Sequence, residues 1–161
     1  MDIKVVHPYK KGVEEFYKFF ADPKTVQTKC EGLGHRNVQN IEAKDEGNAF
    51  TIKTNREIPA SVPAILQKFL GAWNKVIETD VWTKGEGGVR KCEMDVNLVG
   101  VPVKVKGIMT VIPKGSGCEN HCDFKATCGI PLIGGKLADF VGGLVKKSMD
   151  EEFQYITKAM G

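Results

Sequence analysis

The sequence predicts an α+β fold in which a curved, seven-stranded antiparallel sheet wraps around a long C-terminal helix. Three observations support this fold class. Seven segments alternate apolar and polar residues with the period of two that is typical of β-strands. Two segments with helical spacing lie between the first and second of these strands, and a long helical segment closes the chain. No internal repeat or linker divides residues 1–161, so we expect a single domain.

Composition and charge narrow the classes of function. The chain has 161 residues, of which 42% are hydrophobic, enough to bury a core. Its 23 basic and 20 acidic residues are interspersed, whereas nucleic-acid-binding proteins usually concentrate positive charge on one face, so we expect no nucleic-acid partner. No apolar run approaches the length of a membrane span and no leader begins the chain. These two features, together with an odd count of five cysteines that favours reduced thiols, indicate a soluble, cytoplasmic protein without stable membrane insertion.

The N-terminal third of the chain predicts one strand and two helices. Residues 2–9 alternate, and His7 shares a face with the apolar residues of this strand. Apolar residues at helical spacing predict a helix over residues 12–23 that ends at Asp22-Pro23. Residues 24–34 are typical of a second short helix that ends at a glycine.

Six further strands follow, separated mostly by glycine-bearing joints. They are predicted over residues 35–46, 48–58, 72–84, 88–98, 102–112 and 118–128. Residues 59–71, between the third and fourth strands of the chain, predict a loop with a short helix.

A hairpin around Gly100 joins the strands predicted over residues 88–98 and 102–112. The apolar residues of both strands lie on one face of the sheet only in certain registers. A two-residue turn at Gly100-Val101 satisfies this condition and places Asp95 beside Lys106 on the outer face. Because Pro102 lacks the donor that closes such a turn, a wider loop with the same register is equally consistent with the sequence.

The stretch GCENHCDFKATCGIP, residues 117–131, raises the question of a metal site. On a strand, Cys118 and Cys122 share one face while His121 points to the other. Structural zinc sites place their ligands on knuckles or helix turns, which a single strand does not provide. We therefore expect no metal, and we interpret the cysteines as small apolar groups facing the core.

The final helical stretch, residues 131–160, is the only element long enough to cover the apolar face of the sheet. At 1.5 Å per residue it extends ~40 Å. Gly142-Gly143 separates its two apolar clusters, and a glycine pair is a known cause of kinks. Gly134, Ala138 and Gly142 recur every four residues, which favours either close helix–sheet packing or contact with a ligand.

This layout resembles the START-like (SRPBCC) superfamily, whose helix-grip fold includes the birch-pollen allergens. The resemblance covers the whole chain as topology and is more specific in four places: ADP at 21–23, the hairpin at 82–88, the segment 100–107, and IPLIGGKLADFV at 130–141. Together these resemble a bacterial family catalogued as a domain of unknown function, which supplies no catalytic residues to transfer. The superfamily implies a cavity between sheet and helix that holds an apolar small molecule.

We expect such a cavity to be lined by residues on the inward face of the strands and on the face of the C-terminal helix that points toward the sheet. They are Arg56, Met94, Met109, Cys122, Phe124, Leu137 and Val141. Arg56 shares a face with apolar residues, so its charge needs a partner, solvent or an anionic ligand group. Glu78 and Asp80 lie on a strand whose inner face the pattern does not identify, and neither receives a role. The spacing of residues 129–137 does not match a phosphate loop, and we expect no cofactor.

Three functional hypotheses follow. The first is a carrier or sensor of an apolar molecule that is lipid-, sterol- or polyketide-like, which needs only a lined cavity with a mobile mouth. The second is an enzyme of the cyclase or dehydratase type, which needs a general acid or base over the ligand. The third is an adaptor with a filled core. The sequence defines neither the ligand nor the oligomeric state.

The strand assignment of residues 118–128 makes a prediction about metal content. Protein purified under reducing conditions should contain less than one equivalent of zinc by elemental analysis and keep its melting temperature in the presence of a chelator. A tightly held equivalent of zinc, with unfolding on chelation, would contradict the assignment.

Overall fold

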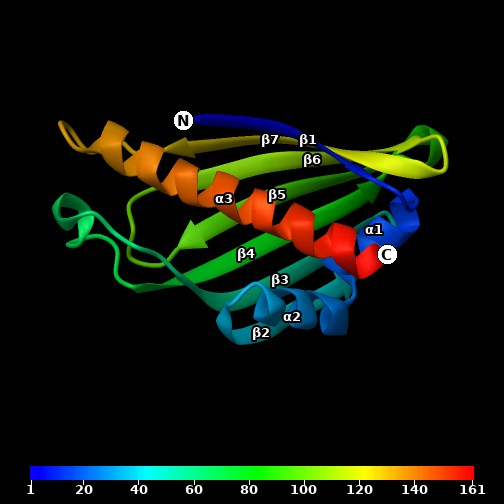
Figure 1. Ribbon diagram of the computed structural model, residues 1–161, viewed down its shortest axis with the longest axis horizontal. Coiled ribbons are helices and arrows are strands. Elements are labelled where there is room, and N and C mark those ends of the chain that lie inside the picture. Colours follow the sequence, from blue (N-terminus) through cyan, green and yellow to red (C-terminus); the bar gives the residue numbers. More distant parts are fainter.

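The computed structural model, residues 1–161, shows a strand, two helices, six strands and a long helix in the predicted order (Figure 1). The strands are β1 (Asp2–Tyr9), β2 (Arg36–Asp45), β3 (Ala49–Pro59), β4 (Trp73–Lys84), β5 (Arg90–Leu98), β6 (Lys104–Lys114) and β7 (Gly117–Thr127). The helices are α1 (Val13–Ala21), α2 (Pro23–Gly32) and α3 (Gly134–Met160), with single 3₁₀ turns at η1 (Ala64–Leu66) and η2 (Glu86–Gly88).

The seven strands form one antiparallel sheet in the order β1-β7-β6-β5-β4-β3-β2. β1 therefore pairs with β7, so the first and last strands of the chain lie side by side. In the β5–β6 hairpin, Asp95 lies opposite Lys106, and their Oδ2 and Nζ atoms are 3.2 Å apart. The ladder ends at Asn97 and Lys104, so the wider of the two predicted loops joins these strands.

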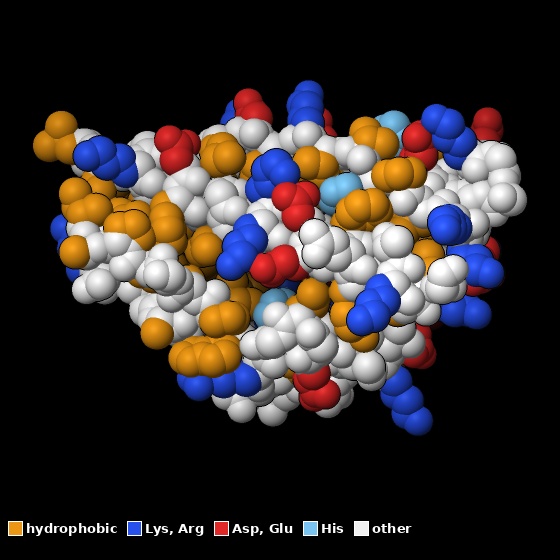
Figure 2. Space-filling model, viewed as in Figure 1, with side chains coloured by type: hydrophobic (Ala, Val, Ile, Leu, Met, Phe, Trp, Pro, Cys, Tyr) orange, Lys and Arg blue, Asp and Glu red, His pale blue; other side chains and the backbone are white.

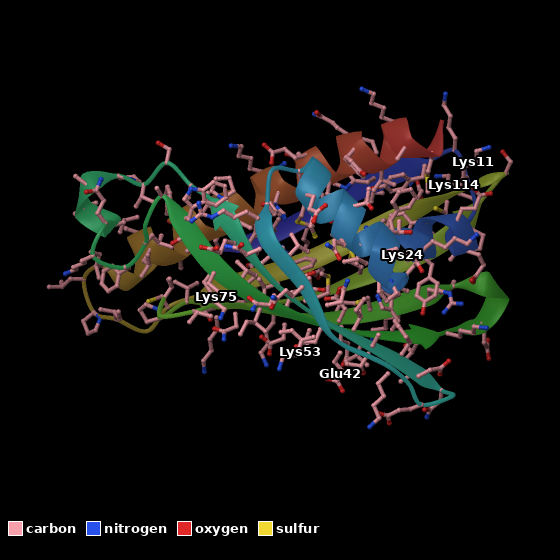
Figure 3. All side chains as sticks on the ribbon, turned by 90° about the horizontal axis from the view of Figure 1, so that it is seen from below. Lys11, Lys24, Glu42, Lys53, Lys75 and Lys114 are labelled. Atoms are coloured by element: carbon pink, nitrogen blue, oxygen red, sulfur yellow. The ribbon has the colours of Figure 1, made fainter.

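The two faces of the sheet differ in the way that the alternation predicts. The outer face carries opposite charges on neighbouring strands, such as Lys4 and Asp123. Figure 3 shows Lys53 and Lys75 pointing away from α3 on this side. His121 is half exposed beside Glu119, whereas Cys118 and Cys122 are buried, so the predicted separation of His121 from the cysteines is confirmed.

α1 and α2 meet at Asp22, which ends the first helix and begins the second. The Asp22 carboxylate accepts a hydrogen bond from the Thr25 backbone N–H, and Pro23 occupies the first turn of α2, where its missing N–H costs nothing. Phe16 and Phe20 of α1 pack against Tyr9 and Trp82. The two helices therefore cover one end of the inner face and leave the middle to α3 (Figure 1).

α3 is a single helix that crosses the inner face of the sheet diagonally (Figure 1). It contacts β7, β1 and α2, and it continues through Gly142 and Gly143 without the interruption that a sharp kink would cause. A Cβ atom at Gly134 would lie 2.8 Å from the Cys128 carbonyl oxygen, and one at Gly142 would collide with the Met1 side chain. The small residues that recur on this helix therefore serve packing against the protein.

Gly107 of β6 makes room for an aromatic ring on the inner face of the sheet. It lies opposite Phe124 of β7, whose ring occupies the space where a Cβ atom of residue 107 would project. This arrangement, in which an aromatic side chain covers a glycine on the neighbouring strand, fixes the position of Phe124.

We predict that Gly107→Ala destabilises the protein by about 1–3 kcal/mol, because the new methyl group forces the Phe124 ring off β6. Urea denaturation measures this change. The matched control is Gly129→Ala, which meets no atom within 4 Å and should shift the midpoint little. Equal stability of the two variants would contradict the packing described here.

Candidate functional site

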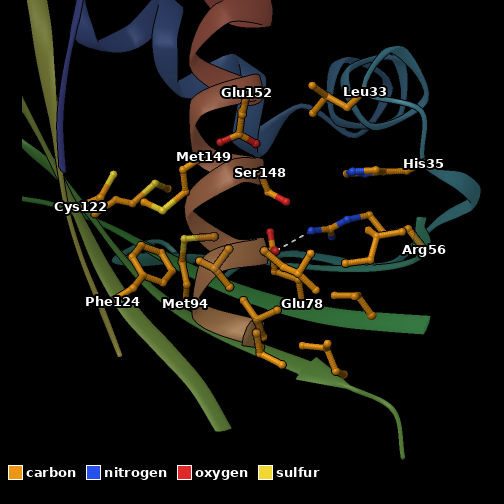
Figure 4. A pocket seen from close by; sticks show the side chains of 18 of the residues that line it. Leu33, His35, Arg56, Glu78, Met94, Cys122, Phe124, Ser148, Met149 and Glu152 are labelled. Atoms are coloured by element: carbon orange, nitrogen blue, oxygen red, sulfur yellow. Dashed lines mark hydrogen bonds and ion pairs between the residues drawn. The ribbon is translucent and has the colours of Figure 1, made fainter. Parts of the chain in front are cut away.

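A cavity of about 90 Å³ lies between α3 and the inner face of the sheet. In Figure 2, hydrophobic side chains line a recess beside α3, and Figure 4 shows the cavity from close by. Fourteen of its 21 lining residues are hydrophobic. The full set is His7, Tyr9, Leu33, His35, Arg56, Ile58, Val76, Glu78, Met94, Val96, Leu98, Met109, Asn120, Cys122, Phe124, Val141, Leu144, Val145, Ser148, Met149 and Glu152.

The apolar wall comes from alternate residues of neighbouring strands and one face of α3. Met109 lies opposite Cys122 in the β6–β7 ladder, and Met94 lies opposite Gly107 in the β5–β6 ladder. On α3 the lining residues recur every three or four positions from Val141 to Glu152, which places them on one side of the helix. The methionines matter because a flexible thioether side chain adapts to irregular apolar shapes.

The structure brings six of the seven sequence-predicted residues together in this wall. They are Arg56, Met94, Met109, Cys122, Phe124 and Val141. Leu137 is fully buried but does not line the cavity, because it lies one turn before Val141, where α3 packs directly on the protein. Whether these residues bind a ligand stays a prediction.

An ion pair forms the polar edge of the cavity. Arg56 of β3 donates a hydrogen bond to the Glu78 carboxylate of β4 over 2.8 Å, shown by the dashed line in Figure 4. Burial alone would raise the pKa of Glu78, but the charge and hydrogen bond of Arg56, together with Lys29 and His35, lower it overall. The Nε atom of Arg56 is buried and has no protein partner. Arg56 thus keeps one donor available at the edge of an apolar space.

A second ion pair joins α2 to α3 beside this edge. Lys29 is buried, and its Nζ atom donates to the Glu152 carboxylate over 2.7 Å. Burial opposes the charge of Lys29, but Glu152, together with Cys30 and Glu78, raises the pKa of Lys29 overall. The Nζ atom also lies 3.8 Å from the centre of the Phe20 ring. Lys29 therefore holds α3 against α2 at the point where the cavity wall ends.

Asp80 is buried beside the two ion pairs, and with them it lines a small adjoining space of about 20 Å³. Burial raises the pKa of Asp80 well above its usual range, and the nearby Glu78 carboxylate adds to the shift, while Lys29 and Arg56 oppose it. One Asp80 oxygen is buried without a partner. A neutral Asp80 leaves two cations balanced by two carboxylates in this cluster, so the buried charges cancel.

Two histidines line the cavity from opposite sides. Burial, aided by Arg56, lowers the pKa of His35 to about 4, so His35 is neutral at pH 7. Its buried Nδ1 atom has no protein partner, and Figure 4 shows the ring pointing toward α3 near Ser148. Burial also lowers the pKa of His7, although Asp150 lies 3.6 Å away and opposes the shift. His7 stacks on Phe153 at 4.4 Å between ring centres, which combines a packing role with access to the cavity.

The cysteines behave as apolar groups. Burial raises the pKa of Cys118 to about 11 and, with a contribution from Glu152, the pKa of Cys122 to about 12. Their thiols therefore stay protonated at neutral pH and lack the reactivity of a thiolate. No three His, Cys, Asp or Glu side chains are arranged to hold a metal ion. The site as a whole can hold an apolar body, with Arg56, His35 and Ser148 placed for one polar group.

Sequence reasoning found Arg56 but missed the other polar residues of the site. The pattern of β4 did not identify its inner face, because Glu78 and Asp80 share that face with Val76 and Trp82. Ser148 and Glu152 continue the helical spacing of Val141 along α3, and that spacing is the signal that could have found them.

Comparison with known proteins gives a family and a fold. Residues 4–159 match the family described as "Protein of unknown function (DUF2505)", and no curated protein matches the chain. Among solved structures, the protein TTHA0849 from Thermus thermophilus is 12% identical with a TM-score of 0.68, covering 98% of this chain and 95% of that one. A conserved protein from Geobacillus kaustophilus is 16% identical with a TM-score of 0.59, covering 99% and 94%.

Human STARD10 has the same fold, at 13% identity and a TM-score of 0.63, with coverage of 98% of this chain and 63% of that one. At these identities the likeness shows the fold alone. It confirms the predicted START-like, helix-grip architecture. None of the helices has the length and apolar character that a membrane span requires.

The protonated state of Asp80 makes a prediction about stability and pH. Above about pH 4 an unfolded aspartate has lost its proton while folded Asp80 retains it. The folded state therefore loses about 1.4 kcal/mol per pH unit from this group as the pH rises, until Asp80 ionises in the fold. Asp80→Asn lacks this loss, so its stability relative to the wild type should increase with pH.

Urea denaturation at a series of pH values above about 5 measures the difference between the two proteins. Carboxylates away from Asp80 whose pKa values are lowered, such as Glu14, lose stability in the opposite direction, as the pH falls. They are common to both proteins and cancel in the comparison. A difference that is constant with pH would show that Asp80 is already ionised in the folded protein.

Proposed function

The chain belongs to the DUF2505 family, and we propose that it binds an apolar small molecule in the cavity between the sheet and α3. The observation that carries the proposal is the cavity itself, which is largely apolar, includes Met94, Met109 and Met149, and has a small number of polar lining residues. Ligand pockets in proteins generally combine an apolar lining with a few placed polar groups. The fold shared with STARD10 is compatible with this role.

The size of the cavity determines what binding requires. Pockets for drug-sized ligands measure roughly 300–1,000 Å³, whereas this cavity measures about 90 Å³. A lipid, sterol-like or polyketide-like molecule therefore needs the wall to move outward. The half-exposed residues Leu144, Val145, Ser148 and Met149 lie on the part of α3 that borders the recess, and rotation of these side chains or a shift of the helix enlarges it.

The polar edge determines how a ligand is oriented. The free Nε donor of Arg56 and the unpartnered Nδ1 of His35 are both buried, and each leaves an unsatisfied group until something hydrogen-bonds to it. A ligand that carries one oxygen-containing polar group at the end of an apolar body meets both needs. We therefore expect amphipathic molecules to bind more tightly than pure hydrocarbons.

The same edge supports a second candidate function, an enzyme that acts on such a molecule. General acid–base catalysis needs an ionisable group within hydrogen-bond reach of the ligand, and His35, Glu78 and Glu152 all line the cavity. A carrier returns its ligand unchanged, whereas a cyclase or dehydratase alters its structure. Incubating the retained compound with fresh protein and comparing its mass spectrum before and after distinguishes the two.

We predict that protein purified without detergent retains a recurrent apolar compound, detectable by mass spectrometry of organic extracts. Met109→Trp should lose it, because the indole fills the cavity, while the circular dichroism spectrum stays unchanged. The matched control is Ile108→Trp, which places the same side chain on the outer face of the same strand. If no compound co-purifies and a panel of fatty acids and sterols leaves the melting temperature unchanged, the proposed function is wrong.

A further inference from the structure

Three connections of the sheet lie together at one end of the molecule. The strands β3, β5 and β7 finish there, and the chain continues into β4, β6 and α3 (Figure 1). In sheet order, the β5–β6 connection lies between the other two. We call this region the loop end and define it as residues 59–76, 96–107 and 126–138.

The loop end is basic. Its three segments contain five lysines and no aspartate or glutamate, although the chain has 20 acidic residues. The lysines are Lys68, Lys75, Lys104, Lys106 and Lys136, and all are exposed. Asp95 pairs with Lys106 and Glu57 lies opposite Lys75. The local excess of positive charge therefore rests on Lys68, Lys104 and Lys136.

The loop end also exposes large apolar side chains. Of the eight large hydrophobic residues that the protein exposes, four belong to it, one or more in each segment. They are Ile65, Trp73, Val99 and Leu132. Figure 2 shows hydrophobic side chains gathered over this end, with lysine side chains beside them.

Leu132 is the most unusual of these residues. Its side chain is 104% exposed, and its φ of 68° is rare for a residue other than glycine. The Ile133 N–H donates to the Pro131 carbonyl over 2.9 Å, which closes a γ-turn of the rare, strained kind around Leu132. A further hydrogen bond from the Gly134 N–H to the Ile130 carbonyl holds this turn at the start of α3. Both the backbone strain and the exposure oppose stability, which points to a role outside the folded core.

We propose that the loop end docks reversibly onto membrane surfaces that contain anionic lipids. Exposed aliphatic and Trp side chains insert at the headgroup level, and the surrounding lysines attract the negative surface. An acidic protein partner accounts less well for Leu132, because a single projecting side chain on a strained turn offers little area for a specific interface.

The loop end adjoins the proposed ligand site. Ile58, Val76 and Leu98, which line the cavity, lie in or beside its segments. Docking there places the cavity next to a bilayer, a source of apolar molecules. The docking itself needs no ligand in the cavity, so vesicle binding and ligand binding can fail separately and each failure is recognisable.

Co-flotation with vesicles tests the proposal. The wild-type protein should bind vesicles of phosphatidylcholine mixed with phosphatidylglycerol, and bind much less to phosphatidylcholine alone or at high salt. Leu132→Ser should reduce binding by about tenfold or more, because the inserted side chain is lost. Its control is Ile41→Ser, which removes an equally large side chain that is exposed on β2.

The double variant Lys68→Glu/Lys136→Glu should weaken binding by about tenfold or more through charge alone. Its control is Lys11→Glu/Lys24→Glu, which makes the same change of net charge. Both lysines are exposed, and Figure 3 shows them away from Lys75, which belongs to the loop end. Absence of binding to every vesicle overturns the proposal, as does equal loss of binding in variants and controls. Light scattering that shows a dimer dissociated by Leu132→Ser would assign the surface to a second copy of the chain instead.

Discussion

The structure depends on one geometric constraint, which is that a single helix must cover a sheet wider than itself. Seven strands at the usual spacing span about 29 Å, whereas a helix with its side chains is about 10–12 Å wide. α3 packs on β1 and β7, and the pair α1 and α2 covers the far end of the sheet (Figure 1). On the middle strands β3–β5, residues such as Ile58, Val76 and Met94 line the gap that remains between the sheet and α3. The cavity is the space that this mismatch leaves.

The buried charges lie where this coverage ends. Arg56 and Glu78 project from β3 and β4 toward the cavity, and Lys29 and Glu152 join the two helices at its margin. Replacing such buried pairs with hydrophobic residues is often neutral or stabilising, so their presence is weak evidence for a role in stability. They do give the apolar space a polar edge with a definite position, which is what a binding site for an amphipathic molecule requires.

Alternation along the strands predicted much of the fold and half of the site. It identified Met94, Met109, Cys122 and Phe124 correctly as inward-facing, because a period of two assigns each residue to one face. It failed on β4, because carboxylates occupy the inner face of this strand, where apolar residues are usual. The contact between Lys29 and Glu152 spans 123 residues, and no local pattern in a single sequence encodes such a pair.

The claim that an apolar molecule occupies the space beside α3 is tested most directly by NMR of the protein labelled with ¹³C in its methionine methyl groups. Of the five methionines, Met94, Met109 and Met149 line the cavity, whereas Met1 and Met160 do not. Addition of fatty acids or sterols should shift the signals of the first three and leave Met160 unchanged. Unchanged cavity methionines across the panel, or a shift confined to Met160, would contradict the account.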